Sequence, residues 1–333
     1  MLITSPITPA KIEPLLGRVY EAASSRHFVS SVSADNYAET CLLAELGLAE
    51  SGNAWGPLFY SETREPIFWA RNIWLSPFRL EFDSIGAAAA ALRGIQRNWY
   101  PTLFTHWRRA ALIQSRLPPM SLRPRPFPWL LPDTPVGAWT LLDEHTLLAS
   151  ASCSSPFPGG VIEFEEDKNG PPSRAYLKLW EALVRCRVWP HAGERCLDAG
   201  ASPGGWTWAL ARLGADVLAV DRAPLAEQVA RMPGVCFMQH NAFSLQPEDI
   251  GPIDWLFCDV ICYPDRLYEW LEKWFAAGLC ESFVCTIKTQ GANTRQNLSD
   301  TLRRFTSLGG QVIHLYHNKH ELTWLKVKQR PDE

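Results

Sequence analysis

From about Ser173 to Lys328 the chain alternates short apolar runs with amphipathic stretches, and this pattern restricts the fold more than any other feature. Amphipathic stretches of helical periodicity lie between most of the runs, which predicts a mostly parallel sheet with helices on both faces. The last two runs are too close for a crossover helix, so we expect them to pair as a hairpin with one strand antiparallel. The seven predicted strands are ERCLDAG, ADVLAVD, VCFMQHN, DWLFCDV, SFVCTIK, QVIHLYH and ELTWLKV.

The chain is long enough for more than one domain. It has 333 residues, whereas a single domain typically takes roughly 100–200 residues. A Ser/Pro/Gly-rich stretch over residues 145–160 and a breaker, KNGPP, indicate a boundary near Gly170. We therefore expect a smaller α+β domain over residues 1–83, an Arg-rich region with a linker over 84–167, and the α/β domain over 168–333.

Composition and cysteine usage favour a cytoplasmic protein. Apolar residues make up 47% and charged residues 20%, as in packed globular proteins. The opening residues show no basic leader before an apolar core, and no run reaches the roughly 20 apolar residues that cross a bilayer. The nine cysteines are odd in number and lie mostly inside apolar runs, so we expect neither disulfides nor a metal site.

A net charge of −3 excludes binding of nucleic acid by overall charge, so any RNA contact must come from a local patch. Between Ser84 and Pro132 there is no acidic residue. Arginines interleaved with aromatics suit phosphate contact and base stacking. The alternative is a solvated helix face followed by a Pro-rich connector. The residues concerned are Arg93, Arg97, Arg108, Arg109, Arg116, Arg123 and Arg125, with Trp99, Tyr100, Trp107, Phe127 and Trp129.

A glycine-rich turn follows the first predicted strand and precedes a predicted helix. Ligands of open α/β sheets bind at this position, where glycines allow close backbone approach and a helix amino terminus suits an anionic group. A proline stands where the pyrophosphate of a dinucleotide would need a backbone donor, which disfavours a dinucleotide-dependent oxidoreductase. The candidate cofactor-binding residues here are Asp198, Gly200, Ser202, Pro203, Gly204, Gly205 and Trp206.

Two polar residues end the next two predicted strands. Asp221 lies about twenty residues after the turn, where an acid can accept hydrogen bonds from both ribose hydroxyls of an adenosine. Asn241 ends the third strand, in a position to bond an adenine edge. An acid at the position of Asp221 occurs in sites for different adenosine cofactors, so it indicates an adenosine and no more. The alternative for each residue is a cap of a strand end.

Four ionisable residues stand where no core requires them. Asp259 and Lys288 close apolar strands, Glu321 opens the last strand, and Lys178 lies in the helix that leads into the domain. Because the ends of neighbouring parallel strands meet at one crevice, we expect Asp259 and Lys288 to lie beside the glycine turn. The alternative is a buried ion pair that only stabilises the fold.

These motifs, in this order, resemble the FtsJ-like RNA ribose 2′-O-methyltransferases, which carry a Lys-Asp-Lys-Glu tetrad. The resemblance rests on PSRAYLKLWEA, CLDAGASPGGWTWAL, FCDV, IKTQ and HNKHELTWLKV. Within that group, the stretch from WLFCDV to SFVCTIK, with the later LYHNKHELT, is most similar to the RlmM type. That type methylates a cytidine ribose in large-subunit ribosomal RNA. The match covers the C-terminal half of the chain.

The resemblance implies a Rossmann-like methyltransferase sheet, S-adenosyl-L-methionine as cofactor and RNA, in particular ribosomal RNA, as partner. It assigns the catalytic tetrad to Lys178, Asp259, Lys288 and Glu321. It also assigns the cofactor site to the turn from Asp198 to Gly205 with Asp221, Asn241 and Asp259. In the catalytic role that we assign to it, Lys288 contacts the 2′-oxygen, and the acids position the lysines.

Two departures from the family pattern concern RNA recognition and the cofactor. The N-terminal stretches HFVSSVSADNYAETCLLAELG and REPIFWARNIWL resemble the leading domain of the RlmM type. The region that follows is shorter than the family's THUMP domain, so a reduced RNA-binding domain is expected over 84–167. Asn241 stands where an Asp is more usual. The alternatives are a catalytically silent RNA-binding relative and a methyltransferase that acts on a small molecule or a protein.

Overall fold

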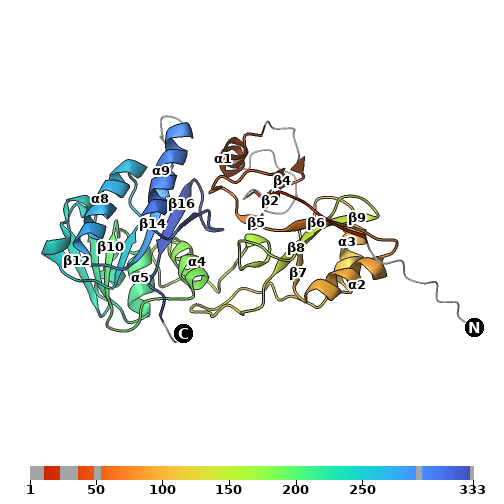
Figure 1. Ribbon diagram of the computed structural model, residues 1–333. Helices are drawn as coiled ribbons and strands as arrows, with labels where there is room; N and C mark the ends of the chain where they lie inside the picture. Colours follow the sequence, from red (N-terminus) through yellow and green to blue (C-terminus); the bar gives the residue numbers. More distant parts are fainter. Residues whose placement is uncertain (1–10, 23–36, 49–53, 290–294, 331–333) are drawn as a thin grey trace, which may run out of the picture. The chain divides into compact units, whose positions relative to one another are not determined.

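The computed structural model describes residues 11–22, 37–48, 54–289 and 295–330 (Figure 1). The chain forms two compact units. The first unit comprises Met1–Pro124 and Pro132–Glu163, and the second comprises Arg125–Leu131 and Phe164–Glu333. The short segment Arg125–Leu131 lies between the two parts of the first unit in sequence but belongs to the second unit.

The first unit is built on a five-stranded sheet with helices on one face. Helices α2 (Ile85–Ile95) and α3 (Trp107–Gln114) pack with the sheet in a common apolar core that includes Leu80, Leu92 and Ile113. Ser84 caps α2 by accepting a hydrogen bond from the Ala87 N–H, as expected for a helix amino terminus. The strand order is β1 (Lys11–Pro14), β6 (Pro77–Glu81), β9 (Thr146–Ser150), β8 (Gly137–Leu141) and β7 (Trp99–Pro101).

A second, four-stranded antiparallel sheet completes the first unit. Its order is β3 (Ala54–Trp55), β4 (Leu58–Ser61), β2 (Arg18–Glu21) and β5 (Asn72–Trp74), with α1 (Tyr37–Leu46) and the short helix η1 (Pro158–Gly160) also in this unit. Helices and antiparallel strands together agree with the expected α+β composition. In the five-stranded sheet, β1 and β6 precede residue 84 in sequence, and β7, β8 and β9 follow it. Residue 84 therefore does not lie between two sheets.

The second unit contains the predicted seven-stranded sheet. Strands β10 to β14 are parallel, β16 is antiparallel to β14, and β15 pairs with β16 as the expected hairpin. All seven strands expected from the apolar runs are confirmed. The order is β12 (Val235–Gln239), β11 (Asp216–Asp221), β10 (Arg195–Ala199), β13 (Trp255–Cys258), β14 (Ser282–Lys288), β16 (Glu321–Lys326) and β15 (Gln311–Ile313).

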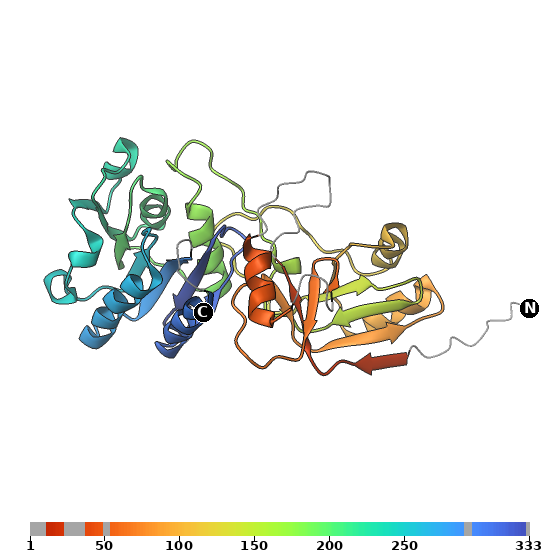
Figure 2. The ribbon, with the colours of Figure 1, turned by 90° about the horizontal axis from the view of Figure 1, so that it is seen from above.

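Helices cover both faces of this sheet, with α8 and α9 on one face and α4 and α5 on the other (Figures 1 and 2). No helix among the described residues is long and apolar enough to cross a membrane. None of the nine cysteines, all of which lie in the described residues, forms a disulfide. The helices are α4 (Tyr176–Cys186), α5 (Gly205–Arg212), α6 (Glu227–Ala230), α7 (Pro247–Ile250), α8 (Pro264–Ala277) and α9 (Arg295–Ser307), with the short η2 (Ala242–Ser244).

The Arg-rich stretch is partly structural. Arg93 donates to the Arg116 carbonyl oxygen at 2.5 Å, and the Arg109 guanidinium lies 5.6 Å from the Phe82 ring centroid. Trp99 is 1% exposed, so its expected role as an RNA-stacking residue is wrong, because its ring fills the core under α2. The exposed members of the stretch that remain include Arg97, Trp107, Arg108 and Arg123.

Phe127 anchors the segment Arg125–Leu131 within the second unit. Its ring stacks on Trp180 of α4 at 4.7 Å with an interplanar angle of 9°, and meets Phe164 and Trp189 edge-on at 6.4 and 6.2 Å. The Arg125 carbonyl oxygen accepts from the Glu165 N–H at 2.9 Å. The segment Arg125–Leu131 is therefore held in the second unit by the Phe127 ring and by a backbone hydrogen bond.

We expect Phe127→Ala to lower the free energy of unfolding of the second unit by about 1–2 kcal/mol, since a half-buried aromatic and its stacking contacts are lost. Urea unfolding followed by near-ultraviolet circular dichroism measures this change. Leu130→Ala is the matched control, because Leu130 is 64% exposed. Equal stability of the two variants would show that Phe127 does not anchor the segment.

Candidate active site

The glycine turn after β10 requires glycine at two positions. Gly200 has a φ of +82°, and a Cβ there would lie 2.5 Å from Cγ2 of Val260. Gly204 has a φ of +114° and precedes the first residue of α5, Gly205. Both φ values favour glycine. Because Gly200 has no side chain, the turn can pass close to Val260 after β13. Gly204 then allows the backbone to enter α5.

Three expected cofactor residues shape this turn. The Ser202 hydroxyl donates to the Pro224 carbonyl oxygen at 2.9 Å. The Pro203 carbonyl oxygen accepts from the Ala226 N–H at 2.9 Å. Trp206 is 3% exposed, and its indole N–H donates to the Ala175 carbonyl oxygen at 2.8 Å. These bonds fix the turn against the segment after β11 and against α4.

Asp198 places a buried carboxyl group at the base of the turn. It is 1% exposed, and its Oδ2 accepts from the Thr207 hydroxyl at 2.6 Å. Its Oδ1 is buried and makes no hydrogen bond within the described part of the chain. Burial raises the pKa of Asp198 to about 7, against the opposing effect of the Thr207 hydrogen bond. A buried acceptor of this kind is costly until a donor satisfies it.

Asp221 ends β11, whereas Asn241 lies two residues after β12 and is the N-cap of η2; both line a cavity. Asp221 accepts from the Ser202 N–H at 3.0 Å and the Ala223 N–H at 2.9 Å, one oxygen for each. Asn241 Oδ1 accepts from the Phe243 N–H at 3.3 Å. Asp221 therefore caps a strand end, as in the alternative interpretation, whereas Asn241 caps the short helix η2 beyond the third strand. Capping leaves both side chains on the wall of the cavity.

The cavity, of about 710 Å³, runs along the carboxyl edge of the sheet. One part of its wall is formed by Gly200, Asp221 and Asn241, and another by Lys288 and Glu321. Residues at the glycine turn and residues near the C-terminus, far apart in sequence, thus line the same cavity. That space can hold a nucleoside-sized ligand next to a second reactant.

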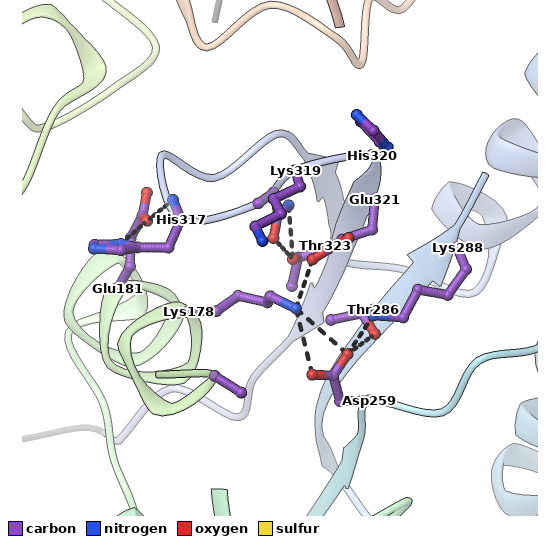
Figure 3. A network of polar contacts seen from close by, with 12 residues as sticks. Lys178, Glu181, Asp259, Thr286, Lys288, His317, Lys319, His320, Glu321 and Thr323 are labelled. Atoms are coloured by element: carbon purple, nitrogen blue, oxygen red, sulfur yellow. Dashed lines mark hydrogen bonds and ion pairs between the residues drawn. The ribbon is translucent and has the colours of Figure 1, made fainter. Parts of the chain in front are cut away.

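The four ionisable residues singled out in the sequence form one chain of alternating charge (Figure 3). Lys178 Nζ lies 2.7 Å from Glu321 Oε1 and 3.3 Å from Asp259 Oδ2. Lys288 Nζ lies 2.6 Å from Asp259 Oδ1. On the sheet, Lys288 and Glu321 stand directly opposite each other. The proximity of Asp259 and Lys288 follows from adjacent parallel strands, whereas Lys178 reaches them from α4.

The ion pairs fix the charge of three members. Burial disfavours the charge of the Lys178 ammonium, but Asp259 and Glu321 outweigh burial and raise the Lys178 pKa. Burial would raise the pKa of Asp259 and of Glu321, but Lys178 and Lys288 lower both. At neutral pH Lys178 is therefore a cation and both acids are anions. Lys288 lines the cavity, whereas Lys178 is 9% exposed behind it.

The sequence interpretation missed two residues that position this group. The Thr286 hydroxyl donates to Asp259 Oδ1 at 2.6 Å. Thr286 lies two residues before Lys288 on β14, so the period of a strand places both on one face, and this spacing was a usable signal. Glu181 lies one helical turn after Lys178 on α4 and contacts the loop before β16. No sequence pattern indicated that loop contact. Among the described residues, no group of three His, Cys, Asp or Glu side chains could hold a metal ion.

We expect Asp198→Asn to stabilise the ligand-free protein above neutral pH. Because the folded pKa of about 7 lies well above the ordinary aspartate pKa of 3.8, the native carboxyl binds protons more readily than the unfolded one. The wild type therefore loses stability as pH rises from about 4 to 7, and the variant does not. The gain at pH 8 should be on the order of 4 kcal/mol. Equal thermal stability of both proteins at pH 8 would contradict the buried charge.

Comparison with known proteins gives a consistent picture. The FtsJ-like methyltransferase family model matches residues 171–298. The ribosomal RNA large subunit methyltransferase M of Halorhodospira halophila is 33% identical over 186 residues, which are 54% of this chain and 54% of that protein. The protein of the same name from Xanthomonas axonopodis pv. citri is 30% identical over 256 residues, 72% of this chain and 69% of that protein.

Solved structures match less of the chain. A putative hemolysin from Lactococcus lactis is 24% identical with a TM-score of 0.40, covering 48% of this chain and 90% of that one. A Methanococcus jannaschii fibrillarin pre-rRNA processing protein is 18% identical with a TM-score of 0.37, covering 45% and 74%. Neither likeness bears on function.

The match to the curated proteins varies in extent. The chain spans about half the length of several of them, as in the Halorhodospira halophila and Azoarcus proteins. It spans 69% of the Xanthomonas axonopodis protein at 30% identity. This alignment reaches beyond the methyltransferase sheet, because it includes 72% of the chain. The chain therefore belongs to the ribosomal RNA large subunit methyltransferase M family.

Proposed function

We propose that this protein transfers a methyl group from S-adenosyl-L-methionine to a ribose 2′-hydroxyl of RNA, and that the RNA is ribosomal. The observation that carries the proposal is the alternating chain of two lysines and two carboxylates beside the cavity. Its relatives are named ribosomal RNA large subunit methyltransferases. A protein that acts on ribosomal RNA is expected in the cytoplasm.

The residues at the glycine turn fit the cofactor. The unsatisfied Oδ1 of Asp198 suits the amino group of an amino-acid tail, and Gly200 leaves space for close approach to the backbone. Asp221 and Asn241 face the cavity where ribose hydroxyls and an adenine edge would be bound. Ser202, Pro203, Gly204, Gly205 and Trp206 shape the turn. When bound, the cofactor supplies a methyl group on a positively charged sulfur.

The protein's own residues must orient the hydroxyl and assist removal of its proton, because a ribose hydroxyl is a poor nucleophile at neutral pH. Lys288 is the lysine that lines the cavity, and in its amine form it accepts the 2′-proton. Asp259 holds Lys288 Nζ at 2.6 Å and is itself held by Thr286. Lys178 balances the charges of Asp259 and Glu321, so that these three charged groups keep the Lys288 Nζ in place.

Transfer of label tests the reaction directly. Labelled S-adenosyl-L-methionine is incubated with the protein and total RNA from cells that lack it. We expect label in RNA, resistant to alkali within one dinucleotide, because a 2′-O-methyl group blocks cleavage of the adjoining phosphodiester. Label in protein or in small molecules would instead support a methyltransferase with another substrate. RNA binding without transfer would support a silent relative.

We predict that Lys288→Met folds and binds cofactor and RNA but loses about 10²–10⁴ in turnover, the usual contribution of a general base. Single-turnover rates of label transfer measure the loss. Lys178→Met should also lose turnover, but the double variant should lose much less than the product of both, since the lysines act as one unit. Near-normal rates for Lys288→Met between about pH 6 and 9 would exclude this role.

The first unit is the proposed source of RNA affinity, with residues 84–167 as a reduced RNA-binding domain. Arg97, Arg108 and Arg123 are exposed, and the Trp107 side chain beside them in sequence is 47% exposed. Exposed arginine and aromatic side chains can contact phosphates and stack on bases. The arginines used in the fold, such as Arg93 and Arg109, are less suited to this role.

We expect the double variant Arg108→Ala/Arg123→Ala to weaken RNA binding and to lower the slope of log affinity against log salt by about 1–2, since each phosphate contact contributes roughly 0.7–0.9. Filter binding over a range of salt concentrations gives the slope. Arg64→Ala is the control, because Arg64 is exposed on the same unit outside the stretch. Cofactor affinity should stay the same. A slope equal to that of the control would assign these arginines to solvation alone.

A further inference from the structure

The loop between β15 and β16, residues 314–320, leads directly into Glu321 and lines the cavity. Lys319 and His320 lie on its wall next to Glu321, with Lys288 in the same wall. Figure 3 shows Lys319, His320 and Glu321 along the loop and the strand that follows it, with Lys288 on the neighbouring strand β14. The loop therefore borders the part of the cavity where the proposed reaction takes place.

A buried carboxylate holds this loop. Glu181 is 1% exposed, and its two oxygens accept from the Tyr316 N–H at 2.8 Å and from the His317 N–H at 2.9 Å. The His317 ring contributes a third contact, with Nδ1 at 2.7 Å. Burying a carboxylate is costly unless several donors satisfy it. Here the donors that satisfy Glu181 belong to the loop.

Further bonds restrain the loop along its length. Asn318 and Thr323 exchange side-chain hydrogen bonds at 3.1 and 3.2 Å. The His320 carbonyl oxygen accepts from the Thr289 hydroxyl at 2.6 Å, one residue after Lys288. The Lys319 carbonyl oxygen lies 3.4 Å from His314 Nε2. The backbone that carries Lys319 is thus fixed on both sides of that residue.

The Lys319 ammonium has no acidic partner among the described residues. Its side chain is exposed, and it makes no ion pair with any residue in the part of the chain that the structure describes. Lys288 differs, because Asp259 pairs with it at 2.6 Å. A restrained loop that presents an unpaired ammonium to the cavity suits an anionic group of the substrate.

We propose that Lys319 binds a backbone phosphate of the RNA next to the target ribose, and that Glu181 is a positioning residue for the loop. This inference rests on the proposed function. A ribose 2′-hydroxyl stands beside its own 3′-phosphate, so an RNA that brings the hydroxyl to Lys288 also brings a phosphate to this part of the cavity. A lysine contacts such a phosphate as a point charge and without reading sequence.

The test compares Lys319→Gln with Lys273→Gln. Lys273 is also exposed, but it lies on α8 outside the cavity wall. With large-subunit ribosomal RNA from cells lacking the protein, we expect Lys319→Gln to raise KM for RNA about tenfold, as for one lost charge-assisted contact. The salt slope should fall by about 0.9, and kcat and cofactor affinity should stay close to wild type. Lys273→Gln should match wild type.

Glu181→Gln keeps the shape of the side chain and removes its charge, which tests the positioning role. We expect this variant to bind cofactor normally and to raise KM for RNA. Adding Lys319→Gln to it should then raise KM less than about threefold, because residues that act through each other are not additive. A full tenfold effect in the Glu181→Gln background would show that Glu181 does not position Lys319.

Different results would contradict the proposed methyl transfer to RNA and the proposed contact of Lys319 with a phosphate. If the wild type transfers no label to RNA, the proposed function is wrong. If the wild type transfers label but Lys319→Gln matches Lys273→Gln in KM and salt slope, the phosphate contact alone is wrong. If Lys319→Gln weakens cofactor binding and leaves KM for RNA unchanged, the anion that it binds belongs to the cofactor, which also overturns the contact.

Discussion

The geometry of the site depends on the carboxylate of Asp259. It accepts from Lys178, Thr286 and Lys288 and so connects the ends of two neighbouring strands to helix α4. Because Lys178 and Lys288 hold its pKa low despite burial, this contribution to stability is present above the unfolded pKa of about 4 and is lost as pH falls through the folded value. Buried charges repay their desolvation only in such well-bonded arrangements.

Three residues of helix α4 make contacts with three different parts of the second unit, and the helix sequence alone does not show which residue makes which contact. Lys178 pairs with Asp259 and Glu321, Trp180 stacks on Phe127 of the connector, and Glu181 holds the loop before β16. Residues three apart on a helix lie on neighbouring parts of its surface, which is why Lys178 and Glu181 can serve adjacent parts of one site. A shift of α4 would therefore disturb the tetrad and the loop together.

The sequence predicted the sheet and much of the site because strand periodicity and strand ends are local signals. It placed Asp259 and Lys288 at one edge, since neighbouring parallel strands end there. Lys178 was singled out as an ionisable residue in the leading helix, but its place beside Asp259 followed only from the family resemblance, because helical periodicity alone does not show where its side chain points. Burial of Trp99 and the role of Glu181 depend on contacts between distant segments. Such contacts leave no periodic trace in the sequence, so neither could be predicted.

The distribution of charge separates the two proposed reactants. At the glycine turn and the tetrad, the four acids Asp198, Asp221, Asp259 and Glu321 outnumber the lysines Lys178 and Lys288, and Asp198 in addition has an unsatisfied oxygen. Such surroundings favour a ligand with a cationic amino group and a positive sulfur, and they disfavour a phosphate. An RNA chain must therefore find its positive contacts at the rim. Lys178 and Lys288 are paired with acids inside the site, whereas the cavity wall also carries Arg222, Arg266 and Lys319. Of these three, Lys319 is close in sequence to Glu321 of the tetrad, and for this reason we propose it for the phosphate next to the target ribose.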